Sequence, residues 1–157
     1  MNSKPDNPGI YIPPPIYIIT VFLLALILQH VIPIKATFLL PIISKIIGWV
    51  LILVSALLGF TALYQFYRSG TTHLTFKPVT ALQTTGLYSL TRNPMYLGLF
   101  LFYTGVSLLI GSWWHLALLP VLFLVFQEYI IKREEQYLER RFGQQYLDYK
   151  NKVRRWL

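Results

Sequence analysis

No charged residue occurs between Ile46 and Tyr67, where the chain reads IIGWVLILVSALLGFTALYQFY. An apolar run of this length can cross the hydrocarbon core of a bilayer as a helix, which needs about 20 residues. Further apolar runs lie on either side of it, at 16–32, 95–110 and 113–131. The sequence therefore predicts an all-α, polytopic membrane bundle of about four transmembrane helices, followed by amphipathic helices.

The composition supports this class of protein. Of 157 residues, 55% are hydrophobic and only 13% are charged, whereas soluble domains carry about 25% charged residues. The absence of cysteine excludes a disulfide framework, a thiolate metal site and a cysteine nucleophile. The three histidines, His30, His73 and His115, show no ligand spacing, so no metal site is expected. These figures argue against a soluble enzyme, a disordered chain and a nucleic-acid module.

The distribution of charge predicts the orientation in the membrane. The net charge is +8, from 14 Lys and Arg against 6 Asp and Glu. Most basic residues follow the last apolar run or lie in the loop 68–93, while the turns at 31–35 and 111–112 carry few. Because basic segments remain in the cytoplasm, both termini and the loop 68–93 are expected there. Anionic headgroups explain the basic excess, and no nucleic-acid partner is needed.

A single integral-membrane domain is predicted over residues 1–157. No small-residue cleavage site follows the first apolar run, so a cleaved signal peptide is not expected. Residues 38–45 are expected at the membrane interface. The predicted parts are a polar segment (1–15), two spans (16–67), a cytoplasmic cofactor loop (68–93), a helical hairpin (94–131) and an amphipathic region (132–157) broken at Gly143.

The loop 68–93 ends in a motif, GLYSLTRNPMY at 86–96. Asn93 followed by Pro94 is typical of a helix start, with asparagine as the N-cap and proline at the first helical position. The free N–H groups of a helix start attract anions, and Arg92 lies beside them. The plain alternative is a helix start without any further role.

Three other residues of this motif suit a ligand site. Gly86 allows close approach of the backbone. The rings of Tyr88 and Tyr96 offer aromatic faces that can bind a cation or stack on a base. Taken singly, each of these signals is weak.

Two adjacent carboxylates, Glu134 and Glu135, follow the last apolar run. In a helix, the neighbours of Glu134 three and four positions away are apolar or aromatic, which predicts that Glu134 lies on the buried stripe. Glu135 has charged neighbours and is expected at the edge of that stripe. An inward carboxylate at the membrane boundary is a candidate functional residue. The alternative is a structural ion pair between Glu134 and Arg92 or Arg68.

Together, these stretches resemble the membrane methyltransferases of the isoprenylcysteine carboxyl methyltransferase and phospholipid methyltransferase families. The resemblance covers about residues 70–157 and depends on the order and spacing of the motifs. The matching pattern is Gly86-x-Tyr88-x-x-x-Arg92-Asn93-Pro94-x-Tyr96-x-Gly98, then Glu134-Glu135-x-x-Leu138-x-x-x-Phe142-Gly143-x-x-Tyr146-x-x-Tyr149, and finally Val153-x-Arg155-Trp156.

The resemblance implies methyl transfer from S-adenosylmethionine to a lipophilic acceptor that enters from the bilayer, such as a prenyl carboxylate or a lipid headgroup. It implies that the cofactor is held without a Rossmann domain, by the loop before the third span and by the start of the post-membrane helix. The predicted catalytic residues are Arg92 and Glu135. The predicted cofactor-binding residues are Thr80, Ala81, Leu82, Gln83, Gly86, Tyr88, Asn93, Pro94, Met95, Tyr96 and Glu134.

The sequence departs from the family pattern at three positions. Asn93 stands where the family usually has histidine, which supports an alternative function as a non-catalytic membrane scaffold or subunit. The arginine that binds the prenylcysteine substrate aligns with Ile130, which argues against a prenylcysteine carboxylate as the acceptor. Leu87 stands where proline is common. A membrane reductase of similar architecture is a further alternative, although no dinucleotide fingerprint supports it.

Overall fold

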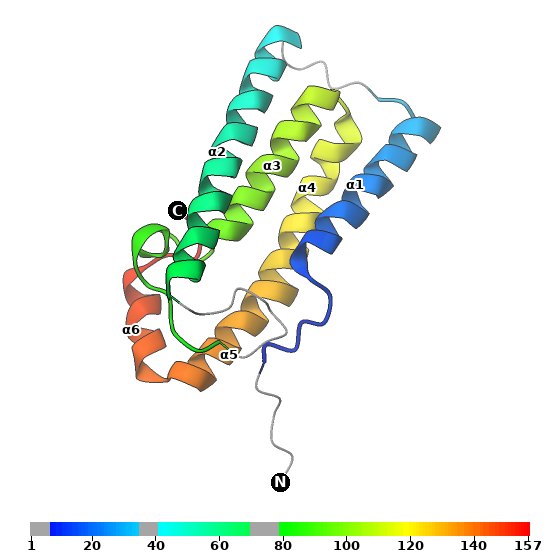
Figure 1. Cartoon of the computed structure of the whole chain (residues 1–157). Helices are drawn as coiled ribbons and strands as arrows, with labels where there is room; N and C mark the ends of the chain where they lie inside the picture. The colour runs from blue at the N-terminus through cyan, green and yellow to red at the C-terminus, as the bar shows by residue number, and fades with distance from the viewer. Residues whose placement is uncertain (1–6, 35–40, 70–78) are drawn as a thin grey trace.

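The structure, a computed structural model, describes residues 7–34, 41–69 and 79–157. The all-α prediction is confirmed, and the long helices form the bundle shown in Figure 1. The elements are α1 (Pro14–Val31), α2 (Pro41–Ser69), the 3-10 helix η1 (Gly86–Ser89), α3 (Pro94–Ile110), α4 (Trp113–Val125), the π-helix η2 (Phe126–Ile131), α5 (Lys132–Phe142) and α6 (Gln144–Lys152).

Three of the described helical segments, Pro14–Val31, Pro41–Gln65 and Trp113–Phe142, are long and apolar enough to cross a membrane. The apolar helix α3 is shorter, with 17 residues, and packs between α2 and α4 (Figure 1). These helices identify a membrane protein. Residues 41–45, which were expected at the membrane interface, form the start of α2; residues 38–40 lie outside the described residues.

Helices α2 and α3 approach closely because small residues face each other. A Cβ atom on Gly48 would lie 2.9 Å from the Gly105 carbonyl oxygen, and one on Gly105 would lie 2.7 Å from the Gly48 carbonyl oxygen. Nearer the site, Gly98 packs on the backbone of Ser55 and Gly59. Small residues are typical of helix contacts in membranes, where the hydrophobic effect does not drive association and close packing must do so.

The predicted hairpin of α3 and α4 is present. Gly111 ends α3 with φ 66° and ψ 33°, a left-handed conformation that glycine adopts without steric cost. After Ser112 the chain runs continuously through α4, η2 and α5, so that one helical rod extends from the bundle to the site. The apolar part of this rod ends at Ile131, and the charged residues of α5 follow.

The short elements gather at one end of the bundle (Figure 1). Helix α1 packs mainly against α4, and α2 packs mainly against α3, so that α1 and α2 lie at opposite sides of the bundle. At the shared end, α5, α6 and η1 close over the helices, and Ile10 of the segment before α1 is buried in the core. The predicted break at Gly143 separates α5 from α6, with φ 53°.

Candidate functional site

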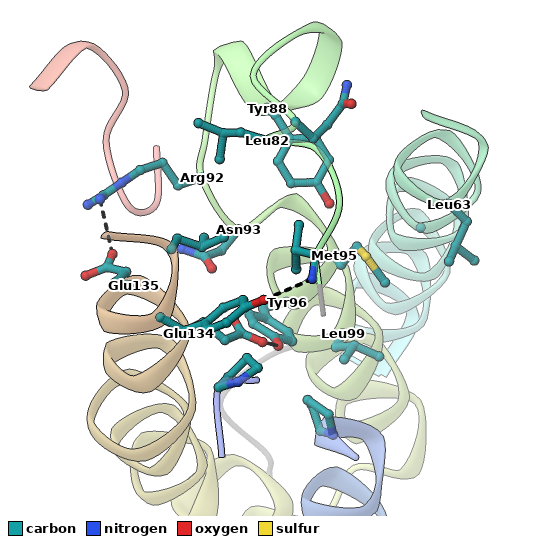
Figure 2. A pocket seen from close by; sticks show the side chains of 18 of the residues that line it. Leu63, Leu82, Tyr88, Arg92, Asn93, Met95, Tyr96, Leu99, Glu134 and Glu135 are labelled. Carbon is teal, nitrogen blue, oxygen red and sulfur yellow. Dashed lines mark hydrogen bonds and ion pairs between the residues drawn. The ribbon is translucent and has the colours of Figure 1, made fainter. Parts of the chain in front are cut away.

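A cavity of about 520 Å³ lies at this end of the bundle. Its volume falls within the range of small-molecule sites, about 300 to 1,000 Å³. Its walls come from segments far apart in the sequence: the prolines before and at the start of α1, the C-terminal half of α2, the N-terminal half of α3, the loop 79–93, α5 and α6. Figure 2 labels side chains from α2, the loop 79–93, α3 and α5 among the residues that line this cavity.

Most of the predicted cofactor residues line this cavity. Three of the predicted residues do not line it: Thr80, Gly86 and Pro94, which is the first residue of α3. Gly86 has φ 63°, and a Cβ atom there would lie 2.1 Å from Gln65 Nε2, so glycine is required by the turn and by the close contact with α2. The predicted residues on the cavity wall are Ala81, Leu82, Gln83, Tyr88, Arg92, Asn93, Met95, Tyr96, Glu134 and Glu135.

Helix α3 begins at the predicted position, but its first turn is not capped as predicted. Asn93 occupies the N-cap position, and its side chain makes no capping hydrogen bond. Instead, Asn93 Nδ2 donates to the Arg155 carbonyl oxygen at 3.0 Å, and the hydroxyl of Thr91 donates to the same oxygen at 3.1 Å. The side chain of Asn93 therefore ties the start of α3 to the segment 153–157.

Glu134 faces the cavity from α5 (Figure 2). Its Oε1 accepts a hydrogen bond of 2.5 Å from the Tyr96 hydroxyl. No lysine or arginine of the described residues pairs with Glu134, so the alternative of a structural ion pair is not observed; Arg68 instead lies over the Tyr64 ring, 6.0 Å from its centroid. Burial raises the pKa of Glu134 to about 7, although the hydrogen bond from Tyr96 opposes this shift. The site thus holds a carboxylate to which the described part of the chain supplies no cationic partner.

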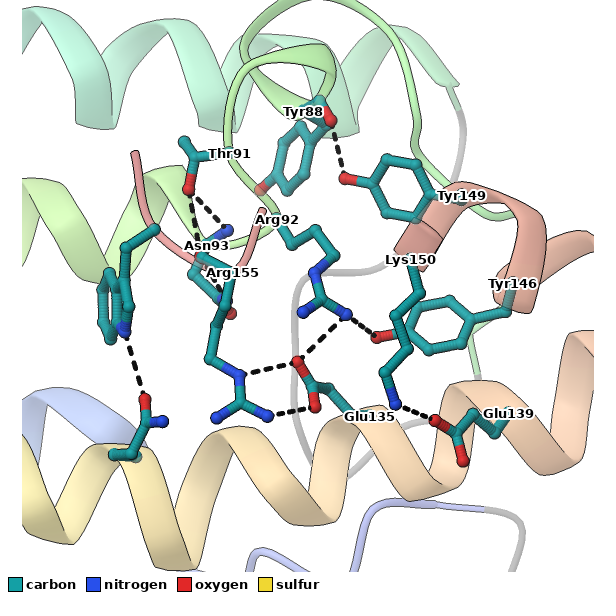
Figure 3. Close-up of polar contacts among 12 residues, drawn as sticks. Tyr88, Thr91, Arg92, Asn93, Glu135, Glu139, Tyr146, Tyr149, Lys150 and Arg155 are labelled. Carbon is teal, nitrogen blue, oxygen red and sulfur yellow. Dashed lines mark hydrogen bonds and ion pairs between the residues drawn. The ribbon is translucent and has the colours of Figure 1, made fainter. Parts of the chain in front are cut away.

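Glu135 has the opposite surroundings. It was expected at the edge of the buried stripe, but it is only 7% exposed, because the segment 153–157 covers it. Arg155 donates to both of its oxygens, from Nε at 2.9 Å and from Nη2 at 2.5 Å (Figure 3). Arg92 Nη1 lies 3.2 Å from Oε1 of the same carboxylate. The hydrogen bond to Glu135 raises the pKa of Arg155, so the guanidinium of Arg155 stays charged.

Tyrosine hydroxyls tie α5 and α6 to the loop 79–93. Tyr149 donates to the Tyr88 carbonyl oxygen at 2.6 Å, and the hydroxyl of Tyr137 accepts from the Val79 N–H at 3.1 Å. The Tyr146 hydroxyl accepts from Arg92 Nη1 at 3.5 Å (Figure 3). Burial raises the pKa of Tyr149 to about 12 and raises the pKa values of Tyr88 and Tyr146 as well. These rings therefore remain neutral and line the cavity as fixed phenols.

Several residues of the cavity were not expected from the sequence. Pro8 and the prolines 13–15 form one wall, and Ser55, Gly59 and Leu63 of α2 form another. The run of prolines was a signal of rigid backbone, but nothing in it indicated contact with the loop 79–93 or α5. Arg155 belonged to the quoted motif, although no role was assigned to it.

The match to known proteins covers most of the elements that build this cavity. The phospholipid methyltransferase family matches residues 43–145, from the start of α2 into α6. The chain belongs to this family. No solved structure gives a significant match.

Three relatives illustrate the similarity. A protein of Haemophilus influenzae, described as uncharacterized, is 48% identical over 65 residues, which are 40% of this chain and all of that protein. The protein-S-isoprenylcysteine O-methyltransferase of Schizosaccharomyces pombe is 32% identical over 107 residues, 61% of this chain and 45% of that enzyme. The enzyme of the same name from Saccharomyces cerevisiae is 39% identical over 74 residues, 46% of this chain and 30% of that enzyme. The chain spans less than half the length of either yeast enzyme.

Proposed function

We propose that this protein transfers a methyl group from S-adenosylmethionine to a lipophilic acceptor at the cytoplasmic face of the membrane. The observation that carries the proposal is Glu134, a partly buried carboxylate that faces the cavity opposite the start of α3 and has no cationic partner among the described residues. A membrane methyltransferase needs such a group because its methyl donor carries a sulfonium and an ammonium.

The charged groups of the cavity suit both ends of the amino-acid part of S-adenosylmethionine. Glu134 can accept charge-assisted hydrogen bonds from the ammonium or from the ribose hydroxyls. Arg92 also lines the cavity, so its guanidinium can donate to the carboxylate. S-adenosylmethionine supplies an activated methyl group when bound. Glu134 and Arg92 would orient it, and the tyrosines would exclude water from it.

The apolar side of the cavity suits the acceptor. Met95 and Leu99 of α3, Leu63 of α2 and the prolines at the start of α1 line the same cavity. This wall can hold an alkyl or isoprenoid chain. Ile130 is fully buried in the hydrophobic core, so the position where the resemblance expects a carboxylate-binding arginine supplies no charge. Ile130 thus supports a lipid headgroup over a prenylcysteine carboxylate.

The proposed topology has four spans, with both termini and the cavity on the cytoplasmic side, in a single integral-membrane domain. It is supported by the basic residues of α5, α6 and the segment 153–157, which cluster at the end of the bundle that holds the cavity. In this orientation the cofactor would enter from the cytoplasm and the acceptor from the bilayer.

Two measurements on the purified protein in lipid nanodiscs test the function. Calorimetric titration with S-adenosylhomocysteine should show binding, and Glu134→Gln should weaken it at least tenfold because a charge-assisted hydrogen bond is lost. The matched control is Glu128→Gln, since Glu128 is exposed and its ion pair among the described residues is with the exposed Lys132. Failure of the unaltered protein to bind would refute the proposed cofactor.

The second measurement is transfer of radiolabel from S-adenosylmethionine into a total lipid extract. Label in one lipid class would identify the acceptor, and mass spectrometry should show the addition of one methylene. Binding without label in any acceptor would instead support the scaffold function that Asn93 suggested.

A further inference from the structure

The segment Val153–Leu157 lies across the site and contacts two of its walls. The chain leaves α6 at Val153 in an extended conformation, with φ −119° and ψ 131°. It then runs between the loop 91–93 and α5 (Figure 3). Arg92 N–H donates to the Arg154 carbonyl oxygen at 3.0 Å, so the backbone of this segment fixes Arg92, two residues before the first residue of α3.

Two side chains anchor the segment on the long helical rod. Trp156 Nε1 donates to Gln127 Oε1 at 3.1 Å, and the Trp156 ring packs on Phe100 and Phe123. The guanidinium of Arg155 makes a bidentate contact with the carboxylate of Glu135. Since Arg155 is also the residue whose carbonyl oxygen binds Asn93, one residue links the helix start to the carboxylate on α5.

The charge count in this cluster is uneven. Arg92 and Arg155 supply two positive charges, and Glu135 supplies one negative charge. Arg155 occupies both carboxylate oxygens, whereas Arg92 makes one longer contact, through Nη1 alone. The side chain of Arg92 is 10% exposed and lines the cavity, yet its Nε has no partner among the described residues.

We propose that Arg155 is a positioning residue of the cofactor site: by neutralising Glu135, it leaves Arg92 available to bind the carboxylate of the methyl donor. This inference rests on the proposed function. Without Arg155, Glu135 would be a buried carboxylate with Arg92 as its remaining partner. The guanidinium of Arg92 would then form a bidentate contact with that carboxylate. A buried charge without a partner is costly, so Glu135 would compete directly with the ligand for Arg92.

The test compares two ligands that differ only in the carboxylate. S-adenosylhomocysteine carries it, and decarboxylated S-adenosylhomocysteine lacks it but retains the ammonium that Glu134 would bind. The unaltered protein should bind S-adenosylhomocysteine about tenfold more tightly, as expected for one hydrogen bond to a charged group. In Arg155→Gln this preference should fall to less than about twofold, because only the carboxylate-bearing ligand loses a partner.

Two further variants make the comparison decisive. Arg154→Gln is the matched control, since Arg154 is exposed and offers the site only its main-chain carbonyl oxygen; it should retain the tenfold preference. Arg155→Lys should give an intermediate preference, because lysine keeps the charge but cannot form the fork. If thermal unfolding shows that Arg155→Gln does not fold, the test depends on Arg155→Lys and on its preference for S-adenosylhomocysteine over the decarboxylated ligand.

The outcomes separate the inference from the proposed function. If the unaltered protein binds neither ligand, the proposed function and the inference both fail. If it binds both and the Arg155 variants keep the tenfold preference, the inference alone is overturned. Equal weakening of the two ligands would also overturn it, because that result marks a merely structural role.

Discussion

Glu134 and Glu135 are neighbours on one helix, and their surroundings differ completely. Consecutive residues on an α-helix point about 100° apart, so Glu134 faces the cavity while Glu135 faces the loop and the segment 153–157. Glu135 is neutralised by two arginines, whereas Glu134 has only a tyrosine hydroxyl. Burial of a carboxylate is thus accommodated in two ways, by an ion pair at one residue and by a raised pKa at the other. The residue left without an ion pair is the one that can receive a ligand.

The largest effect is expected when the paired carboxylate is removed. Glu135→Gln leaves the nearly buried Arg92 and the partly buried Arg155 without their counter-charge, which should lower the free energy of unfolding by about 3 kcal/mol. Denaturant unfolding in mild detergent, followed by tryptophan fluorescence, measures the change. The control is Glu139→Gln, whose partner Lys150 is about one-third exposed and which should cost less than about 1 kcal/mol. Equal losses of unfolding free energy in the two variants would show that the ion pairs of Glu135 stabilise the fold no more than the more exposed pair of Glu139 and Lys150.

The second effect concerns the unpaired carboxylate and appears in the pH dependence of binding. Because burial raises the pKa of Glu134 to about 7, this group is protonated below pH 7 and charged above it. Affinity for S-adenosylhomocysteine should therefore rise with pH up to about 7, by about tenfold per unit, and then level off. In Glu134→Gln the profile should be flat over this range. A wild-type profile without an inflection between pH 6 and 8 would contradict the assignment.

A smaller effect is expected from the hydroxyl that contacts Glu134. Tyr96→Phe removes the hydrogen bond to Glu134 and keeps the ring, so the fold should be retained. Since that bond lowers the pKa of Glu134, its loss should move the inflection of the binding profile to higher pH. At neutral pH the affinity should fall about threefold to tenfold, as for the loss of one hydrogen bond. An inflection shifted to lower pH would refute the role given to Tyr96.

The smallest effect is expected at a third carboxylate on the same rod. Glu128 is exposed and pairs with Lys132 one turn away, a type of surface pair that contributes about 0.5 kcal/mol or less. Glu128→Gln should leave both the unfolding midpoint and the affinity for S-adenosylhomocysteine within experimental error. A clear loss of either would show that Glu128 contacts the ligand or the bundle in a way that its exposure does not reveal.

The sequence was sufficient to predict the helices, because uncharged runs and turn residues are local signals. The hairpin at Gly111 and the break at Gly143 follow directly from them. The position of Asn93 at the start of α3 was also predictable, but the use of its side chain was not. Its amide binds the Arg155 carbonyl oxygen, and no local pattern places that carbonyl beside the helix start.

The surroundings of Glu135 show the same limit. Helical neighbours three and four positions away describe one face of one helix. From these neighbours alone, Glu135 was predicted at the edge of the buried stripe of that helix. The segment 153–157 approaches from outside the helix and covers it. The walls formed by Pro8 and Ser55 were unpredictable for the same reason, since their contact with the site depends on how distant segments pack.

The π-helix η2, at Phe126–Ile131, comes directly before both carboxylates. A π-turn holds one more residue than an α-turn, and each residue of a helix adds about 100° of rotation. Deletion of a single residue within η2 would thus swing Glu134 away from the cavity while leaving the apolar spans unchanged. In this architecture, a one-codon insertion or deletion is an evolutionary step large enough to create or erase the site without altering any of its side chains.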